Sequence, residues 1–438
     1  MSRGRASLLL AMLIGLMAIP SLADSQARVV RLSEVQGDVQ IDRNTGQDYE
    51  KAYVNLPVTQ GAKLQTKKDA RAEVEFEDGS TLRITPDTVV EFAQLSLRDS
   101  GGKVSIIHVQ EGTAYVRYAG TKGDEFSLTF GQETATPARA SHLRLVMGDT
   151  DARLAVFKGE VQVAGGSTAV KVKRYQTATF DLADKDRHTI AEKLESDPYD
   201  EWDREQDHYQ QQYASSSYSS YSPYAYGTSD LNYYGSFFDS PGYGTLWQPY
   251  FAGAGWDPFM NGMWSFYPGF GYGWVSSYPW GWTPYHYGSW VFLPGNGWAW
   301  QPGGSWAGWN TPRVTNPPAT FQIPQPPGST GMGTVAVNRG PLPATMGTSN
   351  RLMIANDSAG LGIPRGGVKN LGQLSQNVRQ TGSATARLHT APVGTSPSWR
   401  SAPVGSGGPA RSSSSGWHGG TASGHSAAGV HAGGGAHR

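Results

Sequence analysis

The feature that most constrains this chain is a stretch, residues 241–310, that holds eleven of its fourteen tryptophans and neither lysine nor arginine. Within it the pattern W-x-P-[FY]-x-x-G-x-W occurs twice, at residues 256–264 and 282–290, with an offset of 26 residues. Each copy is followed by a second element of the form Gly-x-Gly-Trp, at residues 271–274 and 295–298. A fixed period of this size is typical of a repeated supersecondary unit. We therefore predict a small β-repeat module over this stretch.

The chemistry of the repeat allows two roles for its tryptophans. Proline fixes φ and glycine admits a positive φ, so the pattern suits a strand–turn–strand unit with aromatic rings on both arms. Buried rings would form the core of a thin module, whereas exposed rings would stack on sugars or bind quaternary amines. We expect the ligand-binding rings to be those of the second elements, Trp274 and Trp298. We expect the core rings to be those of the main pattern, Trp256, Trp264, Trp282 and Trp290.

The N-terminus predicts export. Arg3 and Arg5 precede an apolar run over residues 8–19, and small residues follow up to Ala23. A basic start, an apolar core of about a dozen residues and a small-residue exit are typical of a cleaved signal peptide, which we place at residues 1–23. The run is shorter than the roughly 20 residues that span a bilayer. We therefore expect a periplasmic or extracellular protein with no transmembrane helix after cleavage; an uncleaved anchor is the alternative.

The composition limits how this protein is held together. The chain has 438 residues, which allows two or three domains, and it has no cysteine. Disulfides and thiolate metal sites are therefore excluded, and an exported protein of this kind keeps its fold by packing alone. Glycine (56 residues) and proline (27 residues) are together about a fifth of the chain. That share is too large for one compact core throughout.

Residues 29–190 have the pattern of one short strand after another. In residues 71–76 apolar side chains alternate with charged ones, which places the apolar set on a buried sheet face and puts Glu73 and Glu75 in water. Asp-Gly at residues 78–79 then indicates a hairpin turn. Further short strands follow, separated by Gly, Asp and Pro at the spacing of an all-β sandwich or solenoid. We predict a mostly β protein.

Several motifs in this region resemble those of the FecR domain, which is named for the regulator of iron-dicitrate transport. They are Asn-Leu-Pro-Val-Thr-Gln-Gly at 55–61, Arg-Ala-Glu-Val-Glu-Phe-Glu-Asp-Gly at 71–79, Thr-Pro-Ala at 136–138 and Val-Phe-Lys-Gly-Glu-Val at 156–161. The resemblance implies a FecR-like β domain over residues 29–190. In the best-known members this domain is periplasmic, and a transmembrane helix links it to a cytoplasmic part that controls a sigma factor. Here the apolar segment precedes the domain, which departs from that arrangement.

An acidic amphipathic helix is predicted at residues 196–213, where Pro198 suits the first turn and Trp202 and Tyr209 belong to a stripe of helical spacing. We expect this stripe to pack on a neighbouring domain. Residues 214–240 are rich in Ser and Tyr and indicate a linker. With the Trp-rich module, these segments resemble exported FecR-domain proteins that carry a Trp-rich C-terminal module of unknown function. The matching residues are 200–205, 230–237, 242–249, 273–282, 285–290 and 297–303.

Residues 311–438 are predicted to be a disordered tail of Gly, Ser, Pro, Ala and Thr, which cannot bury enough apolar surface to offset the ordering entropy. From residue 313 onward there are ten Lys or Arg and one acid, whereas residues 192–310 hold eleven acids and two bases. This asymmetry predicts that the tail folds back on acidic residues or contacts an anionic surface. Its arginines are dispersed, so nucleic acid is not an expected partner. Four histidines could bind a metal, but a low-complexity end without function is preferred: His418, His425, His431 and His437.

The sequence contains no G-x-S-x-G, H-E-x-x-H, P-loop or dinucleotide-binding motif, and we expect His286 to be packed among aromatic rings. We therefore expect a non-enzymatic protein, without cofactor or metal, that acts by contact in the cell envelope in an interaction or structural role. One alternative is glycan or cell-wall binding through the Trp-rich repeats. Another is a FecR-like periplasmic regulator of transport signalling. The partners considered are a cell-wall glycan or an envelope protein, and the oligomeric state is left open.

Overall fold

The computed structural model describes most of the chain between Arg28 and His389, and all of these residues belong to one compact unit, Met1–Ser398. The described ranges are 28–167, 169–184, 187–214, 222–306, 313–328, 334–340, 343–347 and 350–389. The predicted signal peptide at residues 1–23 lies outside them. So does the last part of the predicted tail, including its four histidines.

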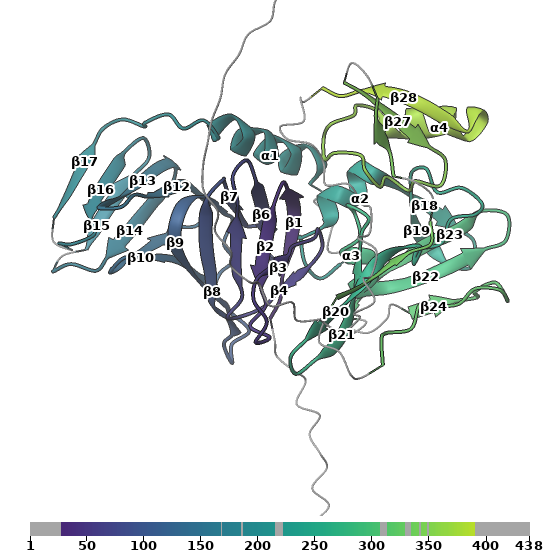
Figure 1. The fold of residues 1–438 in the computed structure, drawn as a ribbon, viewed down its shortest axis with the longest axis horizontal. Helices are drawn as coiled ribbons and strands as arrows, with labels where there is room; N and C mark the ends of the chain where they lie inside the picture. The colour runs from purple at the N-terminus through teal and green to yellow at the C-terminus, as the bar shows by residue number, and fades with distance from the viewer. Residues whose placement is uncertain are drawn as a thin grey trace, which may run out of the picture. The chain divides into compact units, whose positions relative to one another are not determined.

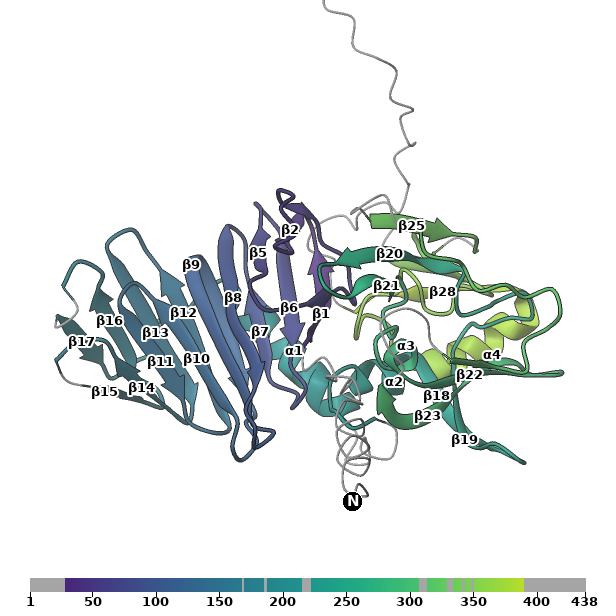
Figure 2. The ribbon, with the colours of Figure 1, turned by 90° about the horizontal axis from the view of Figure 1, so that it is seen from below.

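The N-terminal half forms a β domain of two sheets that share one long strand, β9 (Lys103–Tyr118) (Figures 1 and 2). The first sheet has the order β4 (Pro57–Val58), β1 (Val30–Gln36), β6 (Arg71–Glu75), β7 (Thr81–Ile84), β9, β12 (Ser141–Met147), β13 (Asp151–Lys158), β16 (Thr177–Asp181) and β17 (His188–Ala191). The second has the order β3 (Glu50–Lys51), β2 (Val39–Asp42), β5 (Lys63–Thr66), β8 (Thr88–Leu97), β9, β10 (Glu125–Phe130), β11 (Glu133–Pro137), β14 (Glu160–Ala164) and β15 (Val170–Lys173).

One apolar core fills the β domain and explains the alternation in its sequence. Ala72, Val74 and Phe76 are all buried in this core, as the period of two predicts. Strands of both sheets contribute to it, for example Leu64 from β5 and Leu143 from β12. The prediction of a mostly β chain is therefore confirmed.

The outer face of the first sheet is not in water, which corrects our expectation for its charged residues. Glu73 and Glu75 on β6 are only 0% and 2% exposed. They alternate with the core residues, as predicted, but hydrogen bonds tie this face to a helix after the β domain and to a segment around Arg365. Alternation predicts which residues share a face of a strand. It does not predict what covers that face.

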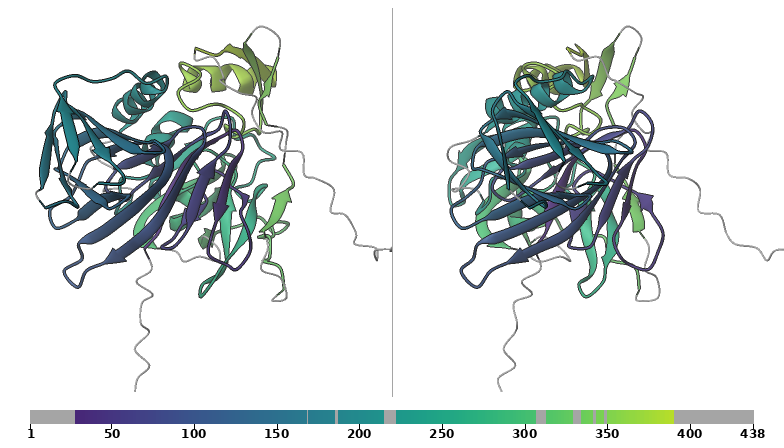
Figure 3. Two further views of the ribbon diagram at one scale, coloured as in Figure 1. Left: turned by 60° about the vertical axis from the view of Figure 1, so that its left-hand side comes forward. Right: turned by 90° about the vertical axis from the view of Figure 1, so that its left-hand side faces the viewer.

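Helix α1 (Asp200–Tyr213) confirms the predicted acidic helix and lies beside the β domain (Figure 3). It begins four residues later than the predicted start at 196. Trp202 and Tyr209 are buried, and the Arg71 guanidinium lies 4.9 Å from the centroid of the Trp202 ring. The expectation of a single helix was too low, because the described residues contain three more: α2 (Thr228–Tyr234), α3 (Thr283–His286) and α4 (Leu371–Thr381).

Residues 222–240 are not a linker, contrary to the prediction for residues 214–240. They contain α2, which runs directly into β18 (Gly235–Ser240). Leu231, Tyr233 and Tyr234 are buried in an aromatic core. A composition rich in Ser and Tyr suggested a polar segment, but tyrosine rings bury large areas where a partner surface exists.

The Trp-rich module is built from three β-hairpins. These are β18 with β19 (Gly244–Pro249), β20 (Asn261–Tyr267) with β21 (Gly271–Ser276), and β22 (Tyr287–Leu293) with β23 (Gly297–Trp306). The first and third hairpins join β24 (Arg313–Thr315) in a five-stranded sheet, in the order β18-β19-β23-β22-β24. The second hairpin pairs with β25 (Thr334–Asn338) in a three-stranded sheet. Hairpins are thus present, but not where we predicted them. Their turns lie between the main pattern and the second element, whereas within the main pattern residues 257–260 precede β20 and α3 precedes β22.

The three hairpins share one register. Each places an aromatic residue directly opposite a tryptophan ten positions later, and each turns at Pro-Gly-x-Gly with both glycines at positive φ. The cross-strand pairs are Phe237 with Trp247, Trp264 with Trp274, and Trp290 with Trp300. The Gly-x-Gly-Trp pattern pairs Trp274 with Trp298, whereas the counterpart of Trp274 in the structure is Trp300. The first copy escapes the sequence pattern because it has Phe237 in place of a tryptophan and lacks the W-x-P start.

Residues 343–347 and 350–389 fold against the module, so the prediction of a disordered tail from residue 311 does not hold for these parts. β26 (Thr345–Met346), β27 (Arg351–Ala355) and β28 (Ser383–Arg387) form a small antiparallel sheet, and α4 lies between the last two strands in the chain. Ile354, Leu361 and Val378 are buried in the same aromatic core as the tryptophans. Composition alone did not predict this, because a few apolar side chains suffice when they pack on large aromatic rings.

Candidate functional site: a buried ion cluster

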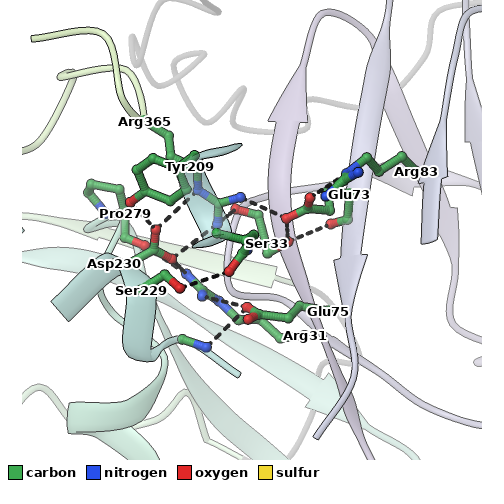
Figure 4. Close-up of polar contacts among 12 residues, drawn as sticks. Arg31, Ser33, Glu73, Glu75, Arg83, Tyr209, Ser229, Asp230, Pro279 and Arg365 are labelled. Atoms are coloured by element: carbon green, nitrogen blue, oxygen red, sulfur yellow. Dashed lines mark hydrogen bonds and ion pairs between the residues drawn. The ribbon is translucent and has the colours of Figure 1, made fainter. Parts of the chain in front are cut away.

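Charged side chains gather on the covered outer face of the first sheet (Figure 4). The adjacent strands β1, β6 and β7 contribute four of them, while α2 and the segment after β27 contribute one each. The strand residues alternate with core residues and therefore point away from the apolar core. We call this group the ion cluster and define it by six members whose side chains are at most 8% exposed, Arg31, Glu73, Glu75, Arg83, Asp230 and Arg365.

Glu73 is the most fully paired carboxylate of the cluster. It accepts hydrogen bonds from Arg83 Nε at 2.8 Å, from Arg365 Nη1 at 2.7 Å and from Ser33 Oγ at 2.7 Å (Figure 4). Burial by itself would raise the pKa of Glu73, but the two guanidinium groups outweigh burial and lower this pKa to about 2. The side chain is therefore an anion at neutral pH and is held by two different parts of the chain.

Asp230 of α2 connects the β domain to the C-terminal segment. Arg31 Nη2 lies 2.6 Å from its Oδ2 atom, and Arg365 donates to both carboxylate oxygens at 3.1 Å. The Tyr209 hydroxyl of α1 donates to Oδ1 at 2.8 Å. Charge-assisted and bidentate hydrogen bonds of this kind are the stronger ones in proteins. One carboxylate thus joins β1, α1, α2 and the segment that carries Arg365.

Glu75 differs from Glu73 although the two share one strand face. Arg31 Nη1 donates to its Oε2 atom at 3.2 Å, and the backbone N–H of Gly227 donates to the same atom at 3.0 Å. Burial raises the pKa of Glu75 to about 7, because the partial compensation by Arg31 is opposed by the nearby Asp230. Arg31 is closer to Asp230 than to Glu75, so it does not fully compensate both acids.

Helix α1 attaches to the cluster through Arg83. Arg83 Nη1 donates to Oδ1 of Asp203 at 2.6 Å and to Oδ1 of Asp207 at 2.8 Å. Burial opposes ionisation of Asp203, but His142 and Arg83 outweigh it and lower its pKa. The two aspartates are one helical turn apart, so both can face one guanidinium group. The acidic character of α1 is therefore explained by the arginine of the sheet that it covers.

The second hairpin of the module also contacts the β domain directly. Asn55 Nδ2 donates to the backbone oxygens of Ser276 and Tyr278 at 3.0 and 2.7 Å. Met263 and Val275, from β20 and β21, belong to the apolar core of the β domain. Polar and apolar contacts thus join the two regions beside the ion cluster.

The two residues that we predicted to bind a ligand are buried. Trp274 is 2% exposed and packs edge-on against Trp264, and Trp298 is 3% exposed and packs against Phe292 and Phe321. The expectation that these two rings present free faces was therefore wrong. A ligand-binding role for them stays a prediction. The expected core rings, Trp256, Trp264, Trp282 and Trp290, are all buried as predicted.

His286 is packed, as expected. Its ring lies edge-on against Trp282 with the centroids 4.3 Å apart, and burial lowers its pKa to about 3. Within the described ranges, no group of three or more His, Cys, Asp or Glu side chains is arranged to hold a metal ion. Among the helices that the structure describes, none is long and apolar enough to cross a membrane.

The ion cluster was not predicted, although the sequence contains two signals for it. The first is that acidic residues alternate along β6 while the neighbouring strands β1 and β7 carry arginines at facing positions. The second is the charge asymmetry between the basic C-terminal region and the acidic residues before it. The fold-back contact predicted from that asymmetry is present at Arg365, which pairs with Asp230 and Glu73.

Comparison with known proteins adds two family matches. Residues 62–162 match the family described as FecR protein, and residues 228–316 match a family of unknown function, DUF6600. The second match begins at the first residue of α2 and ends just after β24, so it covers all three hairpins. It therefore coincides with the module that the structure defines, including the copy that the sequence analysis missed.

Two solved structures also resemble the chain. Both are crystal structures of a predicted anti-sigma factor from Parabacteroides distasonis ATCC 8503, with TM-scores of 0.26 and 0.25 and 13% identity. Each match covers 30% of this chain and 59% of the other protein. None of the curated proteins matches the chain.

Proposed function

We propose, from the premise that this chain carries a FecR domain followed by a Trp-rich module of a second family, that it is an exported, non-enzymatic protein. In this proposal it acts by contact in the cell envelope, in an interaction or structural role. Its partner is an envelope protein. The FecR domain and the Trp-rich module act together as one rigid body that presents a fixed surface.

One observation carries the proposal, namely that the two regions share the buried ion cluster. Its six members are enclosed, and their partners come from β1, β6, β7, α1, α2 and the segment around Arg365. A buried ion pair is strongly destabilised when one partner is withdrawn. Opening the regions around a substrate would withdraw such partners. The arrangement therefore favours a fixed contact surface over a site that opens and closes.

A FecR-like periplasmic regulator of transport signalling is the second candidate, and the match of residues 62–162 to the FecR family favours it. Both candidates need a protein partner on the outer side of the inner membrane. They differ in the effect of deleting the protein from the cell. Loss of a regulator would change the expression of a transport system, whereas loss of a structural protein would change the envelope. The glycan alternative lacks a comparable observation, because Trp274 and Trp298 are buried.

Cell fractionation with N-terminal sequencing tests the export part of the proposal. We expect the mature chain in the envelope or the medium, beginning at Asp24, because a signal peptide is predicted to end at Ala23. An intact chain that begins at Met1 in the cytosol would contradict export.

Site-specific photo-crosslinking in cells tests the contact part. Tyr175 and Met353 are large apolar side chains that are 53% and 54% exposed, so a photoreactive phenylalanine analogue at either position leaves the core intact. We expect an envelope protein to be crosslinked from at least one of these positions, and not from the exposed polar Lys122 as a matched control. Equal, unselective labelling from all three positions would contradict a defined contact surface.

A further inference from the structure

The segment 358–368 lies against aromatic side chains in the manner of a bound peptide. Three of its carbonyl oxygens accept hydrogen bonds from aromatic side chains, while others accept from backbone N–H groups, including those of Ala344 and His389. Trp280 Nε1 donates to Ala359 O at 2.7 Å, and the Tyr234 hydroxyl donates to Ile363 O at 2.8 Å. The Tyr233 hydroxyl donates to the carbonyl of Val368 and accepts from its N–H, both at 2.9 Å. Three aromatic side chains thus form hydrogen bonds with the backbone of this segment.

The same segment places the side chain of Arg365 between two buried carboxylates. Arg365 is buried, with Glu73 Oε1 at 2.7 Å and both Asp230 oxygens at 3.1 Å, and it donates to the Ser33 carbonyl at 3.1 Å (Figure 4). The guanidinium carbon lies 5.1 Å from the centroid of the Tyr209 ring. Two carboxylates and an aromatic face match the charge and the planar shape of a guanidinium group. The ammonium group of a lysine could not form the same bidentate and stacking contacts.

The backbone of the segment is held in a conformation that it would not prefer by itself. Ala359 has a φ of 46°, in the left-handed region that a residue with a Cβ atom disfavours. Gly360 and Gly366 have φ values of 85° and 67° and pack against the rings of Tyr234 and Tyr209. Strain of this kind persists only where the surroundings enforce it. The docking contacts therefore work against the local preference of the segment.

From these observations we infer that the segment 358–368 is a ligand bound in cis. The surface that holds it, which we call the cradle, is a peptide-binding site that recognises arginine. The cradle consists of Tyr209, Asp230, Tyr233, Tyr234 and Trp280, with Glu73 at its floor. The partner that it fits is a turn-forming segment of another protein that carries one arginine beside small residues. Such a segment takes the place of residues 358–368, and its arginine replaces Arg365 in the ion cluster, so that Glu73 and Asp230 keep a cationic partner. The inference rests on the proposed contact function, because it names the chemistry of the partner.

Chemical rescue of the full chain with Arg365→Ala tests the arginine hole. We expect the melting temperature of this variant to fall by several degrees, and 5–20 mM ethylguanidinium, a range on the order used for weak ligands, to restore part of the loss. Ethylammonium at equal ionic strength serves as the control and should not restore it. Adding Asp230→Asn to the variant should abolish the rescue. A folded Arg365→Ala chain that ignores ethylguanidinium, or responds equally to ethylammonium, would overturn the inference.

A second measurement uses the unaltered chain and holds even where Arg365→Ala does not fold. A synthetic peptide with the sequence of residues 357–369 and a photoreactive group is added in excess. We expect it to crosslink to α2 or to the neighbourhood of Trp280 and to speed hydrogen exchange in the chain's own residues 358–368. The same peptide with alanine in place of arginine should do neither. Equal behaviour of the two peptides, or no crosslink from either, would contradict a peptide site. Both tests use purified protein, so they can fail while export and partner crosslinking in cells succeed.

Discussion

Glu73 and Glu75 lie two residues apart on one strand face and have opposite pKa shifts. Burial acts on both, but at Glu73 the guanidinium groups of Arg83 and Arg365 outweigh it and lower the pKa to about 2. At Glu75 burial prevails and the pKa rises to about 7, because Arg31 is shared with the closer Asp230. The placement of the arginines therefore decides which glutamate carries charge at neutral pH.

These shifts predict how stability depends on pH. The pKa of Glu73 is lower in the folded chain than its ordinary value of 4.5, so its stabilisation is present above about pH 4.5 and is lost as the pH falls toward 2. The pKa of Glu75 is higher than 4.5, so its contribution is complete below about pH 4.5 and is lost as the pH rises through 7. Together, the two carboxyl groups stabilise the folded chain most at about pH 5.

Replacing Glu75 by Gln should remove the loss of stability at higher pH, because the uncharged amide resembles the protonated carboxyl group. We expect little change in melting temperature at about pH 5 and a higher melting temperature than the parent at about pH 8, by a few degrees, since one pKa unit is worth about 1.4 kcal/mol. Thermal melts of both chains across this range make the comparison. Parallel curves for parent and variant would show that Glu75 does not titrate there.

Replacing Glu73 by Gln should have the opposite effect at neutral pH. It leaves Arg365 and Arg83 buried with one counter-charge fewer, and removal of one partner from a buried pair costs about 3–5 kcal/mol. Urea unfolding at pH 7 measures the loss. Glu111→Gln, at an exposed position of the same domain, is the matched control and should stay within about 0.5 kcal/mol of the parent. A loss at Glu73 no larger than that of the control would contradict the pairing described.

At the scale of elements, the repeated hairpin depends on a glycine that lies under a tryptophan ring. A Cβ atom at Gly235 would lie 2.4 Å from the Trp247 ring, and one at Gly262 would lie 2.3 Å from the Trp274 ring. Both contacts are far shorter than non-bonded atoms allow. The hairpins therefore need the absence of a side chain at this position as well as the aromatic pair.

We predict that Gly262→Ala lowers the free energy of unfolding by about 1–3 kcal/mol or more, because the ring of Trp274 or the strand must move. Gly304→Ala is the control, since nothing lies within 4 Å of a Cβ atom there. Chemical unfolding followed by tryptophan fluorescence compares the two variants. Equal stability of both would mean that the close approach of Gly262 to the ring is not needed.

Elements could be predicted from the sequence where their signal is local. The alternation in residues 71–76 predicts a strand, and the aromatic stripe predicts α1, because each pattern reflects one buried face. The fold of α2 and of residues 350–389 could not be predicted in this way. Leu231 and Ile354 are buried only by residues far away in the sequence, and a rule based on composition considers each segment without its partners.

At the scale of the whole described unit, the sequence predicts two regions but not how they meet. It indicates which residues face away from the core of the β domain, and it predicts that the basic C-terminal region folds back on acidic residues. It does not indicate that this face is closed by α1, α2 and the segment around Arg365. The ion cluster arises only when all of these segments are in place, so no single segment contains its full signal.

We propose that the β domain and the Trp-rich module form one rigid, cooperative unit through the ion cluster. Differential scanning calorimetry of the full chain tests this most directly. We predict a single transition whose calorimetric enthalpy equals its van't Hoff enthalpy, and a split into two transitions when Glu73 is replaced by Gln. Two separate transitions in the parent chain, unchanged by that substitution, would contradict the account.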